Sequence, residues 1–389
     1  MYHFFRRTLI DHTAPHTTRK LVRFVETLAI SPYKPNLSQD QSLTLSYLTK
    51  SCGFSLQSAK RAISVYKINI KSRKKPDAVR ELLSSHGLSE TRILTLFAKC
   101  PRLITVDPEK TLRPKLDFFI SLGALGPDLH KILFLHWELF IRSLKNQIIP
   151  LLNFLKTFVG TNENLIKVLK RSTNVFSAKI EELMVPNIET LRAHGVPDSQ
   201  IGKLILINAS CLGANRDRFS RAVNEATGMG IDPTTRKFVL TVFTLLRISK
   251  LLWAKKKEAL MSFGWTESEF DSAFEAQPIL MLLSEKKIRD MMDFFVNKIG
   301  LKASDVARCP NVVLTSLEKR IIPRYSVLQG LMSKGLIKEN FNMVWVFSMN
   351  KKRFEVSFVT KYKNVAPEVM KAYEDQVGKD KFLQVTNKS

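Results

Sequence analysis

Lysine and arginine recur at one position of this chain about every 35 residues, and these are the residues whose type and spacing suggest chemistry. A similar phrase occurs at 109–112 (EKTL), 285–288 (EKKI) and 318–321 (EKRI). Ammonium and guanidinium groups bind phosphate, so a row of them would match the backbone of a nucleic acid. We call the candidate residues at this position the basic row: Lys110, Arg113, Lys115, Lys145, Lys179, Lys286, Lys287, Lys319, Arg320 and Arg324.

The same residues have a second interpretation, as ordinary solvated helix faces. Glu109, Glu285 and Glu318 stand beside them and can pair with them locally. The composition favours binding, because 61 Lys and Arg stand against 35 Asp and Glu, a formal net charge of +26. A polyanion is the partner such a charge indicates. Two further basic clusters, at 71–75 and 255–257, fit phosphate contact and plain exposed surface equally well.

No pattern in the chain predicts catalysis. Cys52, Cys100, Cys211 and Cys309 form no Cys-x-x-Cys motif and have no histidines at ligand spacing, so no zinc site is expected. The glycines at 228 and 230 lack the lysine, the hydroxyl residue and the preceding strand of a phosphate-binding loop. We therefore predict no enzyme activity, no metal, no cofactor and no small-molecule substrate.

Nine of the 15 glycines lie at nearly constant spacing and outline the elements that would carry the basic row. We call them the ladder glycines, with gaps of 34 to 37 residues: Gly53, Gly87, Gly123, Gly160, Gly195, Gly230, Gly264, Gly300 and Gly335. Apolar stretches with helical period lie on both sides of them. Glycine adopts the left-handed conformation at a helix end without steric cost. The sequence thus predicts a repeat array of helix pairs joined by glycine turns.

Prolines mark the other boundaries of the repeat. Five lie 9 to 12 residues before a ladder glycine and are expected to open the first helix: Pro76, Pro114, Pro150, Pro186 and Pro323. Three more precede an apolar pair and are expected to end the second helix and begin a short third one: Pro101, Pro278 and Pro310. Trp137 stands near this place in the repeat of Gly123. The repeats of Gly160, Gly195 and Gly230 lack both that proline and the basic phrase.

These features resemble the mitochondrial transcription termination factor (mTERF) family in its plant organellar form. The resemblance is carried by residues 309–328 (CPNVVLTSLEKRIIPRYSVL), 274–300, 45–53 (LSYLTKSCG) and 358–373, and it covers roughly residues 40–375. Tetratricopeptide and pentatricopeptide arrays share the period, but their units have two helices and small-residue signatures that are absent here. HEAT and armadillo units are longer, at about 40–47 residues.

The resemblance implies an all-α fold, a right-handed-type helical repeat solenoid curved around a basic groove. The ladder glycines predict about nine units of ~35 residues, each with two helices and a short third helix. The family motif does not fix the residues that contact bases, so none is carried over to this chain. The array is expected over residues 37–375, followed by a basic tail at 376–389.

Three functions fit this reading. The first is binding of double-stranded DNA to regulate organelle transcription, including its termination, by a protein that acts as a monomer on the nucleic acid. The second is binding of organellar RNA in the splicing of group II introns. The third, from a different class, is a helical scaffold for acidic protein partners. The steep salt dependence of counterion release distinguishes nucleic acid from a protein partner.

Residues 1–36 differ from the repeats and resemble an organelle transit peptide. Six Lys and Arg stand there against Asp11 and Glu26. Arginine with a single serine favours a mitochondrial presequence, and a chloroplast transit peptide is the alternative. A frayed basic helix of the mature protein is the other interpretation. The apolar runs, such as 238–246, are shorter than the ~18 residues of a membrane helix, so no membrane partner is expected.

Overall fold

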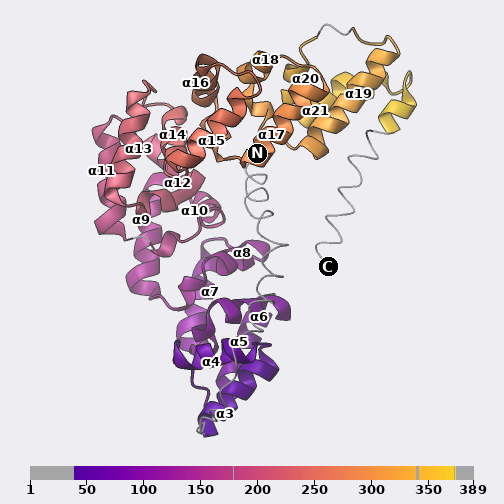
Figure 1. Ribbon diagram of the computed structural model, residues 1–389. Coiled ribbons are helices and arrows are strands. Elements are labelled where there is room, and N and C mark those ends of the chain that lie inside the picture. Colours follow the sequence, from indigo (N-terminus) through magenta and orange to yellow (C-terminus); the bar gives the residue numbers. More distant parts are fainter. Residues whose placement is uncertain (1–38, 178, 339–340, 372, 374–389) are drawn as a thin grey trace, which may run out of the picture. The chain divides into compact units, whose positions relative to one another are not determined.

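The computed structural model describes residues 39–177, 179–338, 341–371 and 373. All regular elements in these ranges are helical, which confirms the all-α prediction. The chain forms two compact units, each with its own hydrophobic core. The N-terminal unit ends at Leu246 and runs from indigo to pink in Figure 1, and the C-terminal unit begins at Arg247 and is orange to yellow. The proposed transit peptide and the basic tail lie outside the described residues.

The first helices of the repeats precede the ladder glycines, and a last one, at residues 351–359, follows the final repeat of the ladder. Several consist of two consecutive segments, a π-helical turn and an α-helix. They are α3 with η1 (Gln39–Ser46, Tyr47–Ser51), α5 (Lys74–Ser85), η3 with α7 (Pro108–Leu112, Arg113–Ser121), η5 with α9 (Leu144–Ile148, Ile149–Val159), η7 with α11 (Ile180–Met184, Val185–Ala193), α13 (Arg216–Gly228), α15 (Lys250–Met261), α17 with η10 (Glu285–Met292, Asp293–Lys298), η12 with α19 (Leu317–Ile321, Ile322–Ser333) and α21 with η13 (Lys351–Phe354, Glu355–Val359).

The second helices follow the ladder glycines. They are α4 (Leu56–Ser64), α6 (Glu90–Lys99), α8 (Pro127–Leu135), α10 (Asn162–Leu169), α12 (Asp198–Asn208), α14 (Arg236–Leu245), α16 (Glu267–Ala276), α18 (Ala303–Arg308) and α20 (Met343–Ser348). Each ladder glycine has a positive φ, between 68° and 99°, so the predicted left-handed turn between the two helices is confirmed.

Short third helices follow most of the second helices. They are η2 (Pro101–Thr105), η4 (Trp137–Phe140), η6 (Val175–Ser177), η8 (Ala209–Gly213), η9 (Pro278–Leu282) and η11 (Pro310–Val312), and η14 (Thr360–Tyr362) lies near the end. Three of them, η4, η6 and η8, form without the proline that begins η2, η9 and η11. Their apolar side chains, such as Phe176 and Leu212, are buried, so burial rather than proline fixes these helices.

Four of the five prolines expected to open the first helices lie inside them instead, whereas Pro76 lies in the first turn of α5 as predicted. In four first helices a π-helical turn precedes the proline, as in Pro108–Leu112 before Pro114. The N–H of Leu112 bonds to the carbonyl of Asp107 at 3.1 Å, five residues back. A proline cannot donate the usual helical bond, and the wider turn accommodates it. The prediction placed these helix starts too late.

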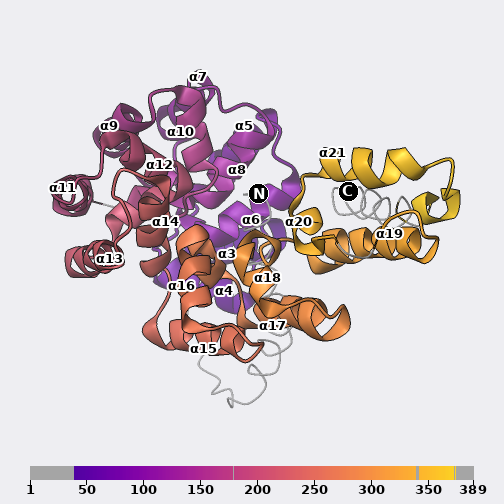
Figure 2. The ribbon, with the colours of Figure 1, turned by 90° about the horizontal axis from the view of Figure 1, so that it is seen from above.

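Like helices of successive repeats pack on each other. Among second helices, α12 contacts α10 and α14, and among first helices, α11 contacts α13. Figures 1 and 2 both show α11 and α13 side by side. In the C-terminal unit, α15 packs on α17 and α16 packs on α18. Each repeat thus buries an apolar face that it could not bury alone. No helix of the described residues is long and apolar enough to span a membrane.

Candidate nucleic-acid interface

Six members of the basic row are exposed near the starts of first helices. They are Lys110, Arg113, Lys145, Lys179, Lys286 and Lys319. Side-chain caps shape these starts. The carboxylate of Asp107 accepts the backbone N–H of Lys110 at 2.8 Å, and the hydroxyl of Ser316 accepts that of Lys319 at 3.2 Å. The caps hold the exposed cations in the first helical turn.

Part of this exposed charge is paired locally, as the second interpretation of the sequence expects. Glu109 accepts two hydrogen bonds from Arg113, at 2.5 and 2.9 Å, and the bond from Arg113 lowers the pKa of that carboxyl. Lys286 bonds to Asp290 at 2.7 Å, which raises the pKa of the lysine, and Lys179 bonds to Glu182. Lys110 and Lys145 form no ion pair with the described residues. Exposed pairs of this kind contribute little stability and can open to bind a ligand.

Charged groups at the start of one first helix act on those at the start of the next. The pKa of Asp107 is lowered first by the backbone hydrogen bond from Lys110, and the charges of Lys75 and Lys110 add to this effect. Lys75 lies at the start of α5 and Lys110 in η3, and these two elements are in contact. In the C-terminal unit, the charge of Glu318 acts on Lys286 of the preceding repeat. Within each unit, neighbouring repeats therefore present their basic turns close together.

The remaining four residues of the basic row do not face solvent, and this corrects the sequence prediction. Lys115 is 5% exposed and Arg324 is 2% exposed, while Lys287 and Arg320 are half-buried. Burial lowers the pKa of Lys115 and of Lys287 to about 8, and that of Arg324 to about 10. Their nitrogens bond to backbone carbonyls of the same repeat, so these cations are occupied within the fold.

Further exposed cations, which are not members of the basic row, also lie at the starts of first helices. They open first helices of both units: Lys74, Lys75, Arg216, Lys250, Lys351, Lys352 and Arg353. For Lys74, Lys75, Arg216 and Lys250 the sequence carries a signal, because each lies 12 to 14 residues before a ladder glycine, whereas no ladder glycine follows Lys351, Lys352 and Arg353. Lys256, from the second basic cluster, is instead buried and bonds to the Met281 carbonyl at 2.7 Å.

Second helices begin with the opposite charge. Acidic residues occupy the first turns of most of them: Glu90, Asp128, Glu163, Asp198, Glu267 and Asp305. Each forms an ion pair, for example Asp198 with Arg192 at 2.8 Å and Glu163 with Lys167 at 2.7 Å. The first turns of α4, α14 and α20 contain no acid, and α14 begins with Arg236 and Lys237. The starts of second helices are thus largely neutralised, whereas those of first helices carry exposed cations.

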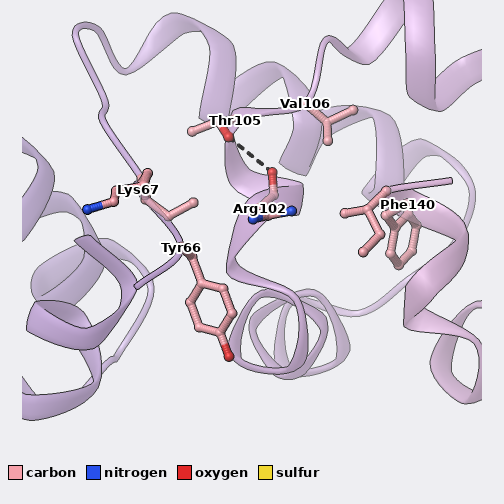
Figure 3. Close-up of a pocket in the computed structure, with 8 residues that line it drawn as sticks. Tyr66, Lys67, Arg102, Thr105, Val106 and Phe140 are labelled. Atoms are coloured by element: carbon pink, nitrogen blue, oxygen red, sulfur yellow. Dashed lines mark hydrogen bonds between the residues drawn. The ribbon is translucent and has the colours of Figure 1, made fainter. Parts of the chain in front are cut away.

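A hollow of about 440 Å³ lies beside the third helices of the N-terminal unit (Figure 3). Its lining includes Tyr66, Lys67, Arg102, Thr105 and Phe140, and the Thr105 hydroxyl donates to the Arg102 carbonyl at 3.1 Å. Figure 3 shows the Lys67 side chain pointing away from Arg102. The two cations do not converge on one point, as a pocket for a single anion would require.

Comparison with known proteins reveals one family. The mTERF family model matches residues 45–355. The chain is 20% identical over 266 residues to Transcription termination factor MTERF8, chloroplastic, of Arabidopsis thaliana, covering 67% of this chain and 51% of the relative. It is 22% identical over 294 residues to Transcription termination factor MTERF15, mitochondrial, of the same plant, covering 74% and 56%. It is 24% identical over 292 residues to human Transcription termination factor 1, mitochondrial, covering 71% of each. The matches thus span about half the length of the two plant relatives.

Proposed function

Because the chain belongs to the mTERF family, we propose that it binds double-stranded DNA in an organelle and regulates transcription there, including its termination. The observation that carries this proposal is the contrast between the two kinds of helix start. Most first helices open with exposed lysine or arginine, in several cases beside an acid, whereas six second helices open with acids that are already paired and carry few cations there. The first-helix starts are therefore the surface offered to a polyanion.

Helix stability does not account for these cations. The N-terminus of a helix carries partial positive charge, so acids stabilise it and cations destabilise it, by roughly 0.3–1 kcal/mol each. Most second helices follow that rule, whereas most first helices place lysine or arginine in or next to the first turn, often beside an acid such as Glu109, Glu285 or Glu318. A phosphate placed at a helix start gains from the free N–H groups and from the lysine together. The cations are thus unfavourable without a ligand and favourable with one.

The stacking of repeats extends the proposed binding surface, because each repeat adds one first-helix start to it. Like helices of neighbouring repeats are in contact within each unit, which supports stacking of the repeats. We propose that about nine repeats form a right-handed solenoid curved around a basic groove. Such a groove would follow a nucleic-acid backbone with one or two cations from each repeat. Phosphate contacts would supply most of the affinity, and a single protein molecule would occupy the site.

Termination adds a requirement to binding. A protein that stops a polymerase must hold its site far more tightly than it holds other DNA, by a factor of about 10³ or more. The names of the relatives support this role and an organellar location. They include both organelles, and we propose the mitochondrion, with the chloroplast as the alternative, from the composition of residues 1–36.

One experiment tests this proposal against its two rivals. The purified chain without residues 1–36 is incubated with mixed fragments of organellar DNA and RNA at physiological salt, and the retained fragments are sequenced. Enrichment of discrete duplex DNA sites is the expected result. Enrichment of intron RNA would replace transcription with splicing of group II introns. Retention of neither nucleic acid would leave a scaffold for acidic proteins.

A further inference from the structure

Buried and half-buried polar side chains of the first helices donate to backbone carbonyls near the last helix before the next repeat, which is usually a third helix. The Lys115 ammonium donates to the carbonyls of Leu139 and Phe140, at 2.8 and 3.1 Å. These carbonyls end η4, the third helix of the same repeat. The last carbonyls of a helix lack hydrogen-bond partners within the helix and carry partial negative charge. An ammonium group supplies both the missing donors and the opposite charge. We call a contact of this kind a carbonyl clamp.

Carbonyl clamps recur in both units. Lys256 donates to the Met281 carbonyl at 2.7 Å, and Lys287 donates to the Leu314 carbonyl at 3.2 Å. Arg324 donates to the carbonyls of Val346, Phe347 and Met349, at 3.3, 3.0 and 2.7 Å, at the end of α20. In the repeat of Gly195 a neutral amide takes this place: Asn187 donates to the carbonyls of Leu212 and Ala214, at 2.8 and 2.9 Å. The shared feature is a hydrogen-bond donor, and a charge is not needed.

Each clamp lies just before an exposed cation of the next repeat. The Phe140 carbonyl precedes Lys145, the Met281 carbonyl precedes Lys286, and the Leu314 carbonyl precedes Lys319, all by five residues. The Ala214 carbonyl precedes Arg216 and the Met349 carbonyl precedes Lys351, both by two residues. The intervening residues include the caps Ser143, Ser284, Asn215, Ser316 and Asn350. The clamped carbonyl is thus a fixed point from which the basic turn begins.

Stability gives little reason for a charged clamp. Burying an ammonium group costs free energy that hydrogen bonds only partly return, and apolar residues of similar size often serve a fold as well. Val79 and Leu152 stand eight residues before their ladder glycines, as Lys115 and Lys256 do, and they are fully buried without any clamp. The fold therefore accepts an apolar residue at this position.

We propose that the clamp donors Lys115, Asn187, Lys256, Lys287 and Arg324 are positioning residues, which fix the cation of the following repeat where it meets a phosphate. This inference rests on the proposed function and assigns to that surface a set of buried residues that touch no ligand. A clamp that is lost should leave the helices folded and move the next basic turn. The affected phosphate contact is then weakened, while contacts of the other repeats stay.

The test uses Lys115 and the cation that follows its clamp, Lys145, in the full chain. A DNA duplex is titrated at several salt concentrations with the wild type, Lys115→Met, Lys145→Gln and the double variant. The slope of log K against log salt is negative, and each lost phosphate contact reduces its magnitude by about 0.9. We expect Lys115→Met and Lys145→Gln each to reduce the magnitude of the slope by that amount. The double variant should reduce it no further, because the two single substitutions remove the same contact. Lys115→Gln, which keeps a donor as Asn187 does, should retain the wild-type slope.

Other outcomes overturn the inference in distinct ways. A wild-type slope for Lys115→Met would show that the clamp does not position Lys145. An additional loss in the double variant would show general loosening in place of a shared contact, and an unfolded Lys115→Met would show that the clamp serves the fold itself. Lys256→Met with Lys286→Gln repeats the test in the C-terminal unit. A wild type that binds no nucleic acid would instead refute the proposed function.

Discussion

The backbone of Gly202 in α12 packs so closely on Phe158 in α9 that a β-carbon at position 202 would lie 2.6 Å from the Phe158 carbonyl oxygen. That distance is far below van der Waals contact, and a backbone carbonyl cannot turn aside as a side chain can. Gly202 is fully buried within the second helix of its repeat. The contact fixes how closely neighbouring repeats approach in this part of the N-terminal unit.

Replacement of Gly202 by alanine should therefore destabilise the protein. Alanine is the better helix former by about 1 kcal/mol, but forcing a methyl group into packed backbone costs about 1–3 kcal/mol, so the clash should prevail. Gly228→Ala is the matched control, because Gly228 ends α13 with open space around it and should gain slightly from the same change. Urea unfolding measures both. Equal gains in the two variants would show that α9 and α12 do not approach this closely.

The buried lysine of the first clamp predicts a rise in stability at alkaline pH. Burial lowers the pKa of Lys115 from 10.5 to about 8 in the folded protein. Between those values the unfolded chain binds more protons, so the free energy of unfolding rises as pH goes from 8 to 10.5. The full contribution is on the order of 3 kcal/mol, and it is a penalty on the fold below pH 8.

Urea unfolding across this pH range, compared between the wild type and Lys115→Met, isolates the contribution of Lys115. The stability gap between the two proteins should change in favour of the wild type as pH rises. A gap that is constant from pH 8 to 10.5 would mean that Lys115 titrates normally in the folded protein.

The capping box at the start of α16 predicts a loss of stability when Thr266 is replaced by alanine. Thr266 accepts the backbone N–H of Glu269 at 3.2 Å, and the Glu269 carboxylate accepts that of Thr266 at 2.9 Å. Thr266→Ala removes one of these bonds and should cost about 1 kcal/mol. Ser89 is the control, because it occupies the same cap position before α6 without a side-chain bond, and Ser89→Ala should cost less. Thermal unfolding compares them, and equal losses would argue against the reciprocal bonds.

Much of this fold could be predicted because its repeats are marked by residues whose effect on the backbone is local. Glycine at a left-handed turn and an apolar period of 3.6 depend on neighbouring residues, and both predictions hold. The starts of the first helices were placed wrongly since a π-helical turn before Pro114 has no sequence signal of its own. The third helices η6 and η8, expected in every repeat, form without the proline that marks others, because burial of Phe176 and Leu212, which depends on the surrounding repeats, holds them.

The basic row was only partly predictable for a related reason. The sequence places Lys110 and Lys115 at the same position of the repeat, but whether each faces solvent or the core depends on packing. Lys110 is exposed and Lys115 is buried against the third helix of its own repeat. A row drawn from spacing alone therefore mixes surface cations with clamps. It also omits cations such as Lys351, whose repeat has no complete glycine and proline pattern.

The central claim is that exposed cations at the starts of first helices contact phosphate. Its most direct test compares Lys110→Glu with Lys145→Glu, combined in one protein, against Lys156→Glu with Lys203→Glu. All four lysines are exposed in the N-terminal unit, and both double variants change the net charge equally, but Lys156 and Lys203 lie further along their helices. The measurement is the salt dependence of binding to a DNA duplex. We predict that the Lys110→Glu/Lys145→Glu protein shows a slope about 1.8 smaller in magnitude than the wild type, the loss of two phosphate contacts. The Lys156→Glu/Lys203→Glu protein should keep a slope near the wild-type value. Equal slopes for the two double variants would contradict the claim, because the location of the charge would then be irrelevant.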